Sequence, residues 1–274
     1  MVARTAVPHL IYEKRDGIAY ITFNRPEVRN AWSPEAMVRL ADAWRDFNED
    51  DSMVVAIVTG AGDKAFSSGA DLATLIPLFT RARPPEDEWD HRVVKERAIH
   101  NITLHRGYPM YKPVIAAVNG ACRAGGMELL QATDIRIAAE HATFGLSEAK
   151  RGLAPGGGSM VRLARQIPYA KAMEILLTGD AMSAQEAHRI GLVNYVVPAD
   201  EVMPLAEKFA RTLADNGPLA VRKIKEAVIR TSGVPLDEAW KIENELSLEV
   251  TRSEDAREGP LAFMEKRKPN FKGR

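Results

Sequence analysis

The chain of 274 residues has one cysteine, no excess of either charge and no long apolar run. A single thiol, Cys122, excludes an intramolecular disulfide and a zinc site built from thiolates, because each needs at least two cysteines in one chain. Lys plus Arg and Asp plus Glu both number 37, so no overall basic field attracts nucleic acid or anionic lipid. No window approaches the roughly 18 consecutive apolar residues of a membrane span, and residues 1–10 lack a signal-peptide apolar block. We therefore expect a cytoplasmic protein with neither a membrane nor a nucleic-acid partner.

Motifs for metals, nucleotides and serine hydrolases are also missing. The six histidines show no tight ligand spacing, and we interpret His100 and His105 as a partly exposed pair on a helix. Neither a P-loop nor a Gly-x-Gly-x-x-Gly turn opens a strand–helix unit. Ser67 and Ser68 lack the Gly-x-Ser-x-Gly elbow of hydrolases. We expect no metal and no nucleotide cofactor.

The residues that are present indicate a folded α/β protein. Apolar residues make up 46% and charged residues 27%, as in ordinary globular domains. A hairpin is expected over residues 10–23, because Asp16-Gly17 joins two β-rich runs, and a helix over Pro34 to Phe47, because Ser33 can cap it. Buried strands are expected at 53–58, 114–118 and 135–138, alternating with helices. This alternation predicts an α/β fold with parallel pairing.

The second half of the chain is helical in pattern. Helices are expected at 160–166, 170–177 and 183–190, followed by a strand at 192–197 and three helical segments within 201–267. The polar insertion at 81–97 is typical of a mobile loop leading into a helix. We expect an α/β core over residues 1–200 and a helical C-terminal region over residues 201–274.

Two glycine turns follow buried strands and precede helices. One contains Ser68-Gly69-Ala70-Asp71, and the other contains Ala124-Gly125-Gly126. Glycine leaves backbone N–H groups uncovered, and a helix N-terminus adds partial positive charge. If the N–H groups of Ala70 and Gly125 converge, they form an oxyanion hole for a carbonyl oxygen, although such glycines are more often only steric necessities. For Asp71, we favour a helix N-cap.

Two acids, Glu128 and Glu148, stand near these turns and are 20 residues apart. Paired carboxylates around one pocket can divide the roles of base and acid, because proximity and burial raise the proton affinity of at least one. The alternative is that a glutamate at a helix start only complements the helix dipole.

Cys122 is followed by Arg123, which could lower the pKa of the thiol, but we interpret Cys122 as a small packing residue.

Taken together, the motifs resemble the crotonase superfamily, and specifically the enoyl-CoA hydratases. The similarity runs almost from end to end and continues into the C-terminal tail, where Arg257-Glu258-Gly259 precedes Phe263. The motifs that carry it are Asn24-Arg25-Pro26 with Asn30-Ala31, Ala65-Phe66-Ser67-Ser68-Gly69-Ala70-Asp71-Leu72, Lys112-Pro113-Val114-Ile115-Ala116-Ala117-Val118-Asn119-Gly120, and Ala124-Gly125-Gly126-Met127-Glu128.

The resemblance implies a crotonase (ClpP-like) fold, with a repeated ββα spiral core and a C-terminal helical trimerisation region. It makes Ala70 and Gly125 the oxyanion pair that binds the thioester oxygen. Hydratases carry glutamates at both positions matching Glu128 and Glu148, which hold the water that adds across the double bond, whereas isomerases usually keep only the second. The CoA thioester is then the substrate, and no separate cofactor is implied. The family forms trimers or dimers of trimers, so we expect a homo-oligomer.

The resemblance also places the substrate. CoA would lie along the loops at Val28 and Ser68, and the tail helices would approach its adenine and phosphate end, often from a neighbouring subunit. The full set of binding positions expected in this way is Val28, Ser68, Asp71, Leu72, Phe263 and Lys266.

Two features depart from the family pattern. The segment from Leu72 to Met110, which by resemblance walls the acyl pocket, is longer than is usual in hydratases. Gln131 occupies a position where an aliphatic or small residue is more usual.

Other functions remain open at this level. An isomerase, a dehydratase of an unusual hydroxyacyl-CoA or a C–C bond hydrolase would share the oxyanion hole and differ in the acids, so two glutamates favour hydration. An RNA-binding family member would need a clustered basic face, which the zero net charge argues against. A structural or regulatory subunit would not need both glutamates and both glycine turns.

Overall fold

The computed structural model describes residues 7–274, so the expectation drawn from the first ten residues lies mostly outside the described part. The described chain begins with an antiparallel hairpin of β1 (Leu10–Arg15) and β2 (Ile18–Phe23). Asp16 and Gly17 join the two strands with φ angles of 52° and 76°. The Asp-Gly turn predicted from the sequence is therefore confirmed, since both residues readily adopt positive φ.

Four strands, all parallel to β2, extend this hairpin into a six-stranded sheet. Its order is β1-β2-β3-β5-β7-β10, and only β1 is antiparallel. The added strands are β3 (Val55–Gly60), β5 (Val114–Val118), β7 (Ile135–Ala139) and β10 (Tyr195–Val197). As the apolar runs predicted, β3 and β5 are buried almost throughout.

The last strand is shorter than predicted. Leu192 and Val193 are buried, but their N–H groups both bond to the carbonyl of Ala187 at the end of the preceding helix. These two residues close that helix, and sheet pairing begins only where Tyr195 faces Ile137.

A second, smaller sheet crosses from one repeat to the next. Its order is β4-β6-β8-β9, with β4 (Ala65–Ser67), β6 (Ala121–Arg123), β8 (Thr143–Gly145) and β9 (Met182–Ser183). The pairs β3/β4, β5/β6 and β7/β8 each step from the large sheet to the small one before the chain turns into helices. This is the ββα spiral that the resemblance implied.

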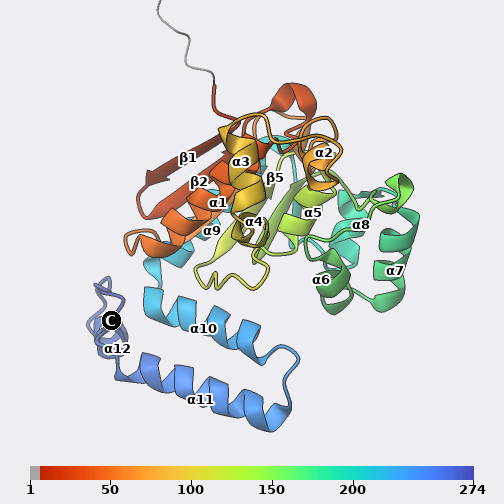
Figure 1. Ribbon diagram of the computed structural model, residues 1–274. Helices are drawn as coiled ribbons and strands as arrows, with labels where there is room; N and C mark the ends of the chain where they lie inside the picture. The colour runs from red at the N-terminus through yellow and green to blue at the C-terminus, as the bar shows by residue number, and fades with distance from the viewer. Residues whose placement is uncertain (1–6) are drawn as a thin grey trace, which may run out of the picture.

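Helices cover the two faces of the spiral (Figure 1). The first, α1 (Pro34–Glu49), begins as predicted, with the Ser33 hydroxyl accepting the Ala36 N–H at 3.1 Å. The others before the C-terminal region are α2 (Leu75–Phe79), α3 (Glu88–Lys95), α4 (Ala98–Thr103), α5 (Gly125–Leu130), α6 (Ser159–Gln166), α7 (Tyr169–Thr178) and α8 (Ala184–Arg189), with 3-10 turns η1 (Pro26–Val28), η2 (Ala149–Arg151) and η3 (Ala199–Glu201).

The polar insertion at 81–97 is only partly a loop. Helix α3 begins inside it, because the Asp87 side chain caps the helix by accepting the Asp90 N–H at 2.8 Å. The Arg83 guanidinium pairs with both carboxylate oxygens of Asp90, whose side chain is 3% exposed. The loop that leads into a helix is therefore confined to residues 81–87.

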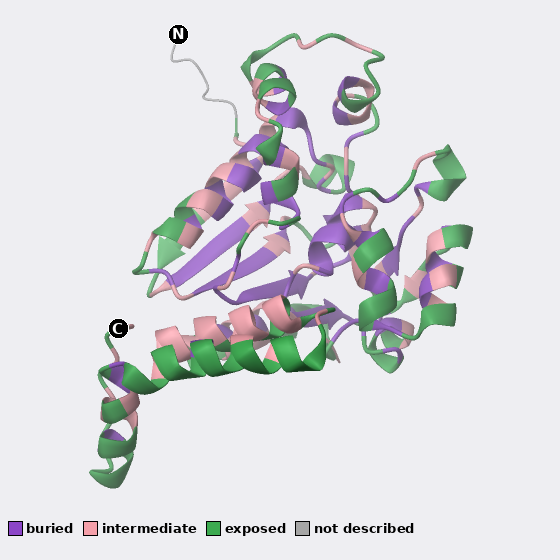
Figure 2. Ribbon diagram, turned by 60° about the horizontal axis from the view of Figure 1, so that its bottom comes forward, coloured by how far each residue is buried: buried purple, intermediate pink, exposed green. Residues whose placement is uncertain are grey.

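The C-terminal region contains four helices where the sequence predicted three. They are α9 (Val202–Asp215), α10 (Pro218–Thr231), α11 (Leu236–Arg252) and α12 (Asp255–Met264). Gly217 and Pro218 separate α9 from α10, because proline starts a helix easily but cannot continue one. Helix α9 packs against β3, β5 and β7, whereas α10 and α11 run side by side below the sheets with their outer faces exposed (Figure 2). Among the helices of residues 7–274, none combines the length and apolar character needed to cross a bilayer.

Candidate active site

The first glycine turn presents one free backbone N–H. Trp32 pairs with this turn as a short parallel bridge, donating its N–H to the Gly69 carbonyl at 2.8 Å and accepting the Asp71 N–H at 3.0 Å. Alternate groups of an extended chain point to opposite sides, so the Ala70 N–H faces away from Trp32. It has no backbone partner within residues 7–274.

The second glycine turn presents another free backbone N–H group, that of Gly125. Gly125 is the first residue of α5, so no carbonyl of that helix can accept its N–H. The preceding residue, Ala124, has φ 46° and ψ −126°, an unusual conformation for a residue with a Cβ. Backbone strain of this kind costs about 1–3 kcal/mol and concentrates at functional sites.

The two turns lie against each other. A Cβ built on Gly69, whose φ is +84°, would stand 2.6 Å from the Gly125 nitrogen. A Cβ on Gly126 would meet the Ser67 carbonyl oxygen at 2.7 Å. Only glycine fits at these contacts, so the close approach of the Ala70 and Gly125 turns depends on two missing side chains.

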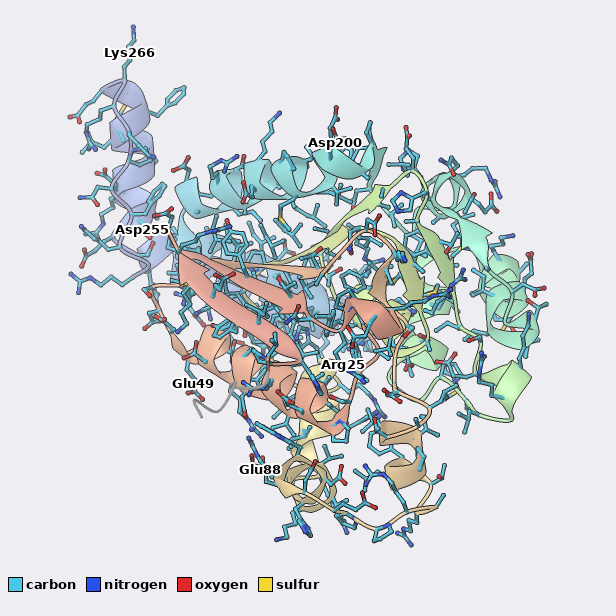
Figure 3. The ribbon with its side chains drawn as sticks, turned by 90° about the horizontal axis from the view of Figure 1, so that it is seen from above. Arg25, Glu49, Glu88, Asp200, Asp255 and Lys266 are labelled. Carbon is cyan, nitrogen blue, oxygen red and sulfur yellow. The ribbon has the colours of Figure 1, made fainter. Side chains whose placement is uncertain are left out.

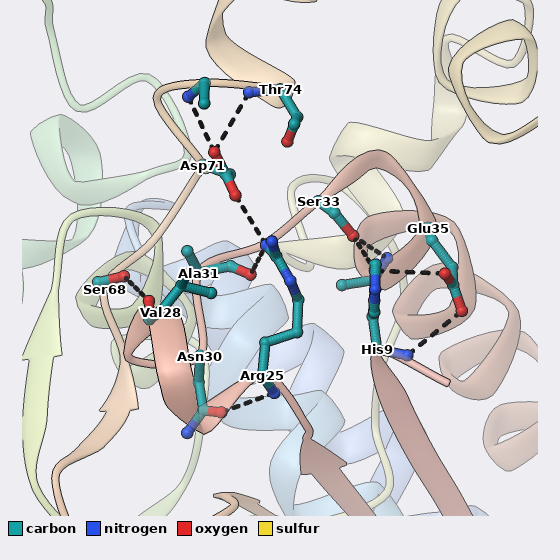
Figure 4. Close-up of polar contacts among 12 residues, drawn as sticks. His9, Arg25, Val28, Asn30, Ala31, Ser33, Glu35, Ser68, Asp71 and Thr74 are labelled. Atoms are coloured by element: carbon teal, nitrogen blue, oxygen red, sulfur yellow. Dashed lines mark hydrogen bonds and ion pairs between the residues drawn. The ribbon is translucent and has the colours of Figure 1, made fainter. Parts of the chain in front are cut away.

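An ion pair holds the first turn in place (Figure 4). The Arg25 guanidinium donates to the Asp71 carboxylate at 2.7 Å and to the Ala31 carbonyl at 2.9 Å. Burial opposes ionisation of Asp71, but the hydrogen bond and charge of Arg25 hold the pKa of its carboxyl below the ordinary value. Asp71 also accepts the Ala73 and Thr74 N–H groups, so it caps the turn that leads into α2. The expected helix N-cap at Asp71 is therefore wrong in position, because α2 begins at Leu75 with Thr74 as its N-cap. The partner of Asp71, Arg25, was not predicted from the sequence.

The two glutamates enter the same cavity from different elements. Glu128 lies in the first turn of α5, and Glu148 directly precedes η2. They are 5% and 9% exposed. Burial raises the pKa of Glu148 to about 7, and the negative charge of Glu128 adds to that effect. Its Oε2 atom has no hydrogen-bond partner in the described chain.

Glu128 has a different environment. Burial raises the pKa of its carboxyl, but the N–H groups of Ser159 and Gly157 oppose that rise by favouring the ionised form. The Ser159 N–H lies 3.4 Å from Glu128 Oε1, and a Cβ on Gly157 would collide with Oε2. Glu128 is therefore the better-stabilised carboxylate of the pair.

These groups share one cavity of about 890 Å³. Ala70, Gly125, Glu128 and Glu148 line it, and so do the sequence-predicted positions Val28, Ser68, Asp71 and Leu72. Much of the remaining wall is apolar and comes from α1, α2 and the turn after α4, namely Met37, Leu75, Ile76, Phe79 and Leu104. A mostly apolar cleft with a few convergent polar groups is typical of a small-molecule site.

Four cationic side chains also line this cavity: Arg29, Arg123, Lys150 and Arg151. Three of them are exposed and Arg123 is half-buried, whereas Glu128 and Glu148 are buried. The charges therefore separate into a cationic rim, in which Lys150 is paired with Asp180, and an acidic floor. The zero net charge of the chain did not reveal this local arrangement.

Phe263 and Lys266 lie elsewhere. Phe263 is 85% exposed in α12, and Lys266 follows that helix at the tip of the C-terminal projection, far from Arg25 (Figure 3). A single chain does not bring these two residues to the cavity.

The expected histidine pair is wrong. His100 lies half-buried in α4 and lines the cavity, but His105 follows the helix with a φ of 48° and is 9% exposed. Burial lowers the pKa of His105 to about 3, and its ring packs on Trp44 with centroids 4.7 Å apart. Within residues 7–274, no group of three His, Cys, Asp or Glu side chains could hold a metal ion.

Comparisons with known proteins agree with this arrangement. The enoyl-CoA hydratase/isomerase family model matches residues 13–274. Enoyl-CoA hydratase EchA19 of Mycobacterium tuberculosis is 43% identical over 97% of both chains, and crotonyl-CoA hydratase of Syntrophomonas wolfei is 37% identical over 97% of this chain and 98% of that protein. The crystal structure of an enoyl-CoA hydratase from M. tuberculosis superimposes with a TM-score of 0.86 at 37% identity, covering 98% of this chain and all of that one.

The two-sheet spiral and its cavity are thus those of a crotonase fold. The chain belongs to the enoyl-CoA hydratase/isomerase family. The resemblance, the fold class and the enzyme class, a hydro-lyase of the enoyl-CoA hydratase type, are confirmed.

The contact between the turns can be tested with Gly69→Ala. The added methyl would push the Gly125 nitrogen away, so we expect kcat/KM for an enoyl-CoA to fall about 100-fold, the effect of losing one oxyanion donor of about 3 kcal/mol. Gly191→Ala is the matched control, because Gly191 has φ +79° and nothing within 4 Å of a built Cβ. Equal losses in both variants would show that backbone strain, and not the contact, is responsible.

Proposed function

We propose that this chain adds water reversibly across the double bond of a trans-2-enoyl-CoA, giving a 3-hydroxyacyl-CoA. The observation that carries the proposal is the meeting of two buried glutamates and two unpartnered backbone N–H groups in one cavity. Hydration needs hydrogen-bond donors that stabilise negative charge on the thioester oxygen, and acid–base groups for the water. This arrangement offers both.

The backbone would act on the thioester. As water attacks C3, negative charge develops on the thioester oxygen, and the N–H groups of Ala70 and Gly125 would stabilise it. Donors fixed by the fold need no reorganisation when the charge appears. The positive end of α5 adds to the field at Gly125.

The two glutamates would divide the proton transfers. Glu128, with N–H donors at its carboxylate, is suited to be ionised and to take a proton from the attacking water. Glu148, with an unpartnered oxygen and a pKa of about 7, is suited to hold the proton that C2 receives. Dehydration would use the same groups in reverse.

A dehydratase acting on a hydroxyacyl-CoA is the second candidate. Carnitinyl-CoA dehydratases of Escherichia coli and Proteus mirabilis are 38% identical to this chain over 95% of its length. Hydration and dehydration are one reaction in opposite directions, so the same residues would serve both. The acyl group that fits between α2 and α4 would decide between them.

The CoA part of the substrate would lie at the cationic rim. Val28, Ser68, Asp71 and Leu72 line the cavity near these cations, and the Asp71 carboxylate is already occupied by Arg25. The backbone of Asp71 is therefore the part available to a ligand.

The thioester is the substrate, and the proposal involves no further cofactor. Such a reaction belongs to fatty acid and lipid metabolism, and the single cysteine favours a cytoplasmic location.

The C-terminal region would form a homo-oligomer, either a trimer or a dimer of trimers. Helix α10 has no buried residue, and α10 to α12 expose many large apolar side chains, which is typical of an interface. These are Ile224, Val228, Ile229, Leu236, Trp240, Leu248, Leu261, Phe263 and Met264. We keep the division into a core of residues 1–200 and an oligomerisation region of residues 201–274 as part of this proposal.

Glu128→Gln and Glu148→Gln test the acid–base roles. Each should reduce kcat for hydration of crotonyl-CoA by about 10²–10⁴-fold, because glutamine can neither accept nor supply the proton. Loss of the enoyl-thioester absorbance measures the rate. Glu140→Gln is the control, since Glu140 is exposed outside the cavity. If either cavity variant keeps most of the wild-type rate, its assigned role is wrong.

The pH dependence should be bell-shaped in both directions. Hydration starts with Glu148 protonated and Glu128 ionised, and dehydration starts with the reverse, so each needs one proton on the pair. As pH rises through about 7, Glu148 loses its proton and kcat/KM should fall. The ratio of forward to reverse kcat/KM should stay constant, because the reaction releases no proton. A rate that rises through pH 7 would contradict the assignment.

Lys266→Ala tests the contribution of a neighbouring subunit. We expect the wild type to sediment as a trimer or hexamer. We expect the variant to show a several-fold rise in KM at unchanged kcat, because an exposed cation that contacts phosphate contributes about 1 kcal/mol. Lys268→Ala is the control, since Lys268 pairs with Asp215 of its own chain at 2.7 Å. A fully active monomer would exclude the shared site.

A further inference from the structure

Gln131 is a buried amide beneath the acidic floor of the cavity. It follows α5 directly and is 2% exposed. Its Nε2 donates to the Ser159 hydroxyl at 2.7 Å and to the Met127 carbonyl at 3.1 Å, whereas its Oε1 has no partner in the described chain. A buried oxygen without a partner costs about 1–3 kcal/mol, which an aliphatic residue of the same size would avoid.

The contact of Gln131 leads to Glu128 through one residue. Ser159 is fully buried and is the first residue of α6. Its hydroxyl accepts from Gln131, and its backbone N–H lies 3.4 Å from Glu128 Oε1. Gly158, with φ 131°, precedes Ser159, and because glycine has no side chain it does little to restrict the backbone conformation here. The side-chain amide of Gln131 therefore fixes the first residue of α6, where the Ser159 N–H faces the Glu128 carboxylate.

Gln131 is itself held firmly. Its backbone carbonyl accepts from Gln166 Nε2 at 2.8 Å and from Arg136 Nη2 at 3.2 Å. These two bonds anchor the backbone of Gln131, and the Met127 carbonyl holds its side-chain amide independently of Ser159. A support that does not move can orient the group it contacts.

We propose that Gln131 is a positioning residue for Glu128, acting through the Ser159 hydroxyl to keep the Ser159 N–H aimed at the carboxylate. The effect on the hydration rate rests on the proposed function, but the effect on Glu128 itself does not.

Four ionisable side chains besides Glu128 face this point. Arg162 of α6 and Arg106 after α4 favour the ionised form of Glu128, and Glu148 repels it. His105 is neutral above pH 3 because burial lowers the pKa of its imidazole to about 3. None of these four contacts Gln131 or Ser159 by a hydrogen bond, and Arg136 of β7 contacts only the backbone carbonyl of Gln131, so all five act equally in a side-chain variant at residue 131. Loss of the N–H donor removes support for the ionised form, so the pKa of Glu128 should rise.

Gln131→Met is the direct test, because methionine keeps the volume and lacks the amide. We expect kcat for crotonyl-CoA to fall about 10-fold with KM unchanged within twofold, the effect of a weakened hydrogen bond to a charged group. The acidic limb of the kcat–pH profile should move to higher pH. The infrared carboxyl band of Glu128, assigned by its loss in Glu128→Gln, should titrate at higher pH in the free enzyme.

Ser159→Ala and Gln166→Ala complete the design. Ser159→Ala removes only the hydroxyl and should reproduce both shifts, and the double variant with Gln131→Met should add little, because the two residues act in series. Gln166→Ala loses a contact to Gln131 but none to Glu128, so it should leave the Glu128 titration unchanged.

Each outcome decides a separate point. An unchanged Glu128 titration in Ser159→Ala would overturn the positioning role, and this variant decides the point even if Gln131→Met proves unstable. An equal shift in Gln166→Ala would also overturn it, by showing a general packing effect. If the wild type does not hydrate enoyl-CoA but the infrared shift is present, the positioning role stands and the proposed function fails.

Discussion

The close contact between the turns at Gly69 and Gly125 is the constraint on which the rest of the site depends. Two backbones can approach this closely only without side chains between them, and the unfavourable geometry of Ala124 persists because its surroundings hold it. The Arg25–Asp71 ion pair and the Trp32 bridge fix one turn, and the start of α5 fixes the other. A pair of donors built from backbone does not depend on which side chains stand around it, so the acids of the cavity can change without changing these donors.

The two carboxylates in this cavity differ because their surroundings differ. Both lose hydration, which raises the pKa of each. Backbone N–H groups compensate Glu128 alone, so the first proton of the coupled pair would leave mainly from Glu128, and Glu148 would keep the second. In the proposed reaction, the start of α6 would thus decide which glutamate is the acid and which is the base. This is why a residue outside the cavity, Gln131, can bear on the chemistry.

Much of the fold could be predicted because it follows from local rules. The apolar runs of β3 and β5, the Asp16-Gly17 turn and the Ser33 cap are each decided by a few neighbouring residues. The errors have a tertiary cause. Leu192 is apolar enough for a strand but closes a helix, and His105 is buried against Trp44, which is distant in the sequence. Gln131 stood out in the sequence as unusual, yet its role required the position of Ser159, which no local pattern predicts.

The arrangement of charge explains how a neutral chain could orient a strongly anionic substrate. The cations at the cavity, Arg29, Arg123, Lys150 and Arg151, are exposed or half-buried, and the acids are buried at its floor. Phosphates would be attracted to the rim and repelled from the floor, so the CoA end would stay outside while the apolar acyl end enters. Orientation would then require no net charge on the protein.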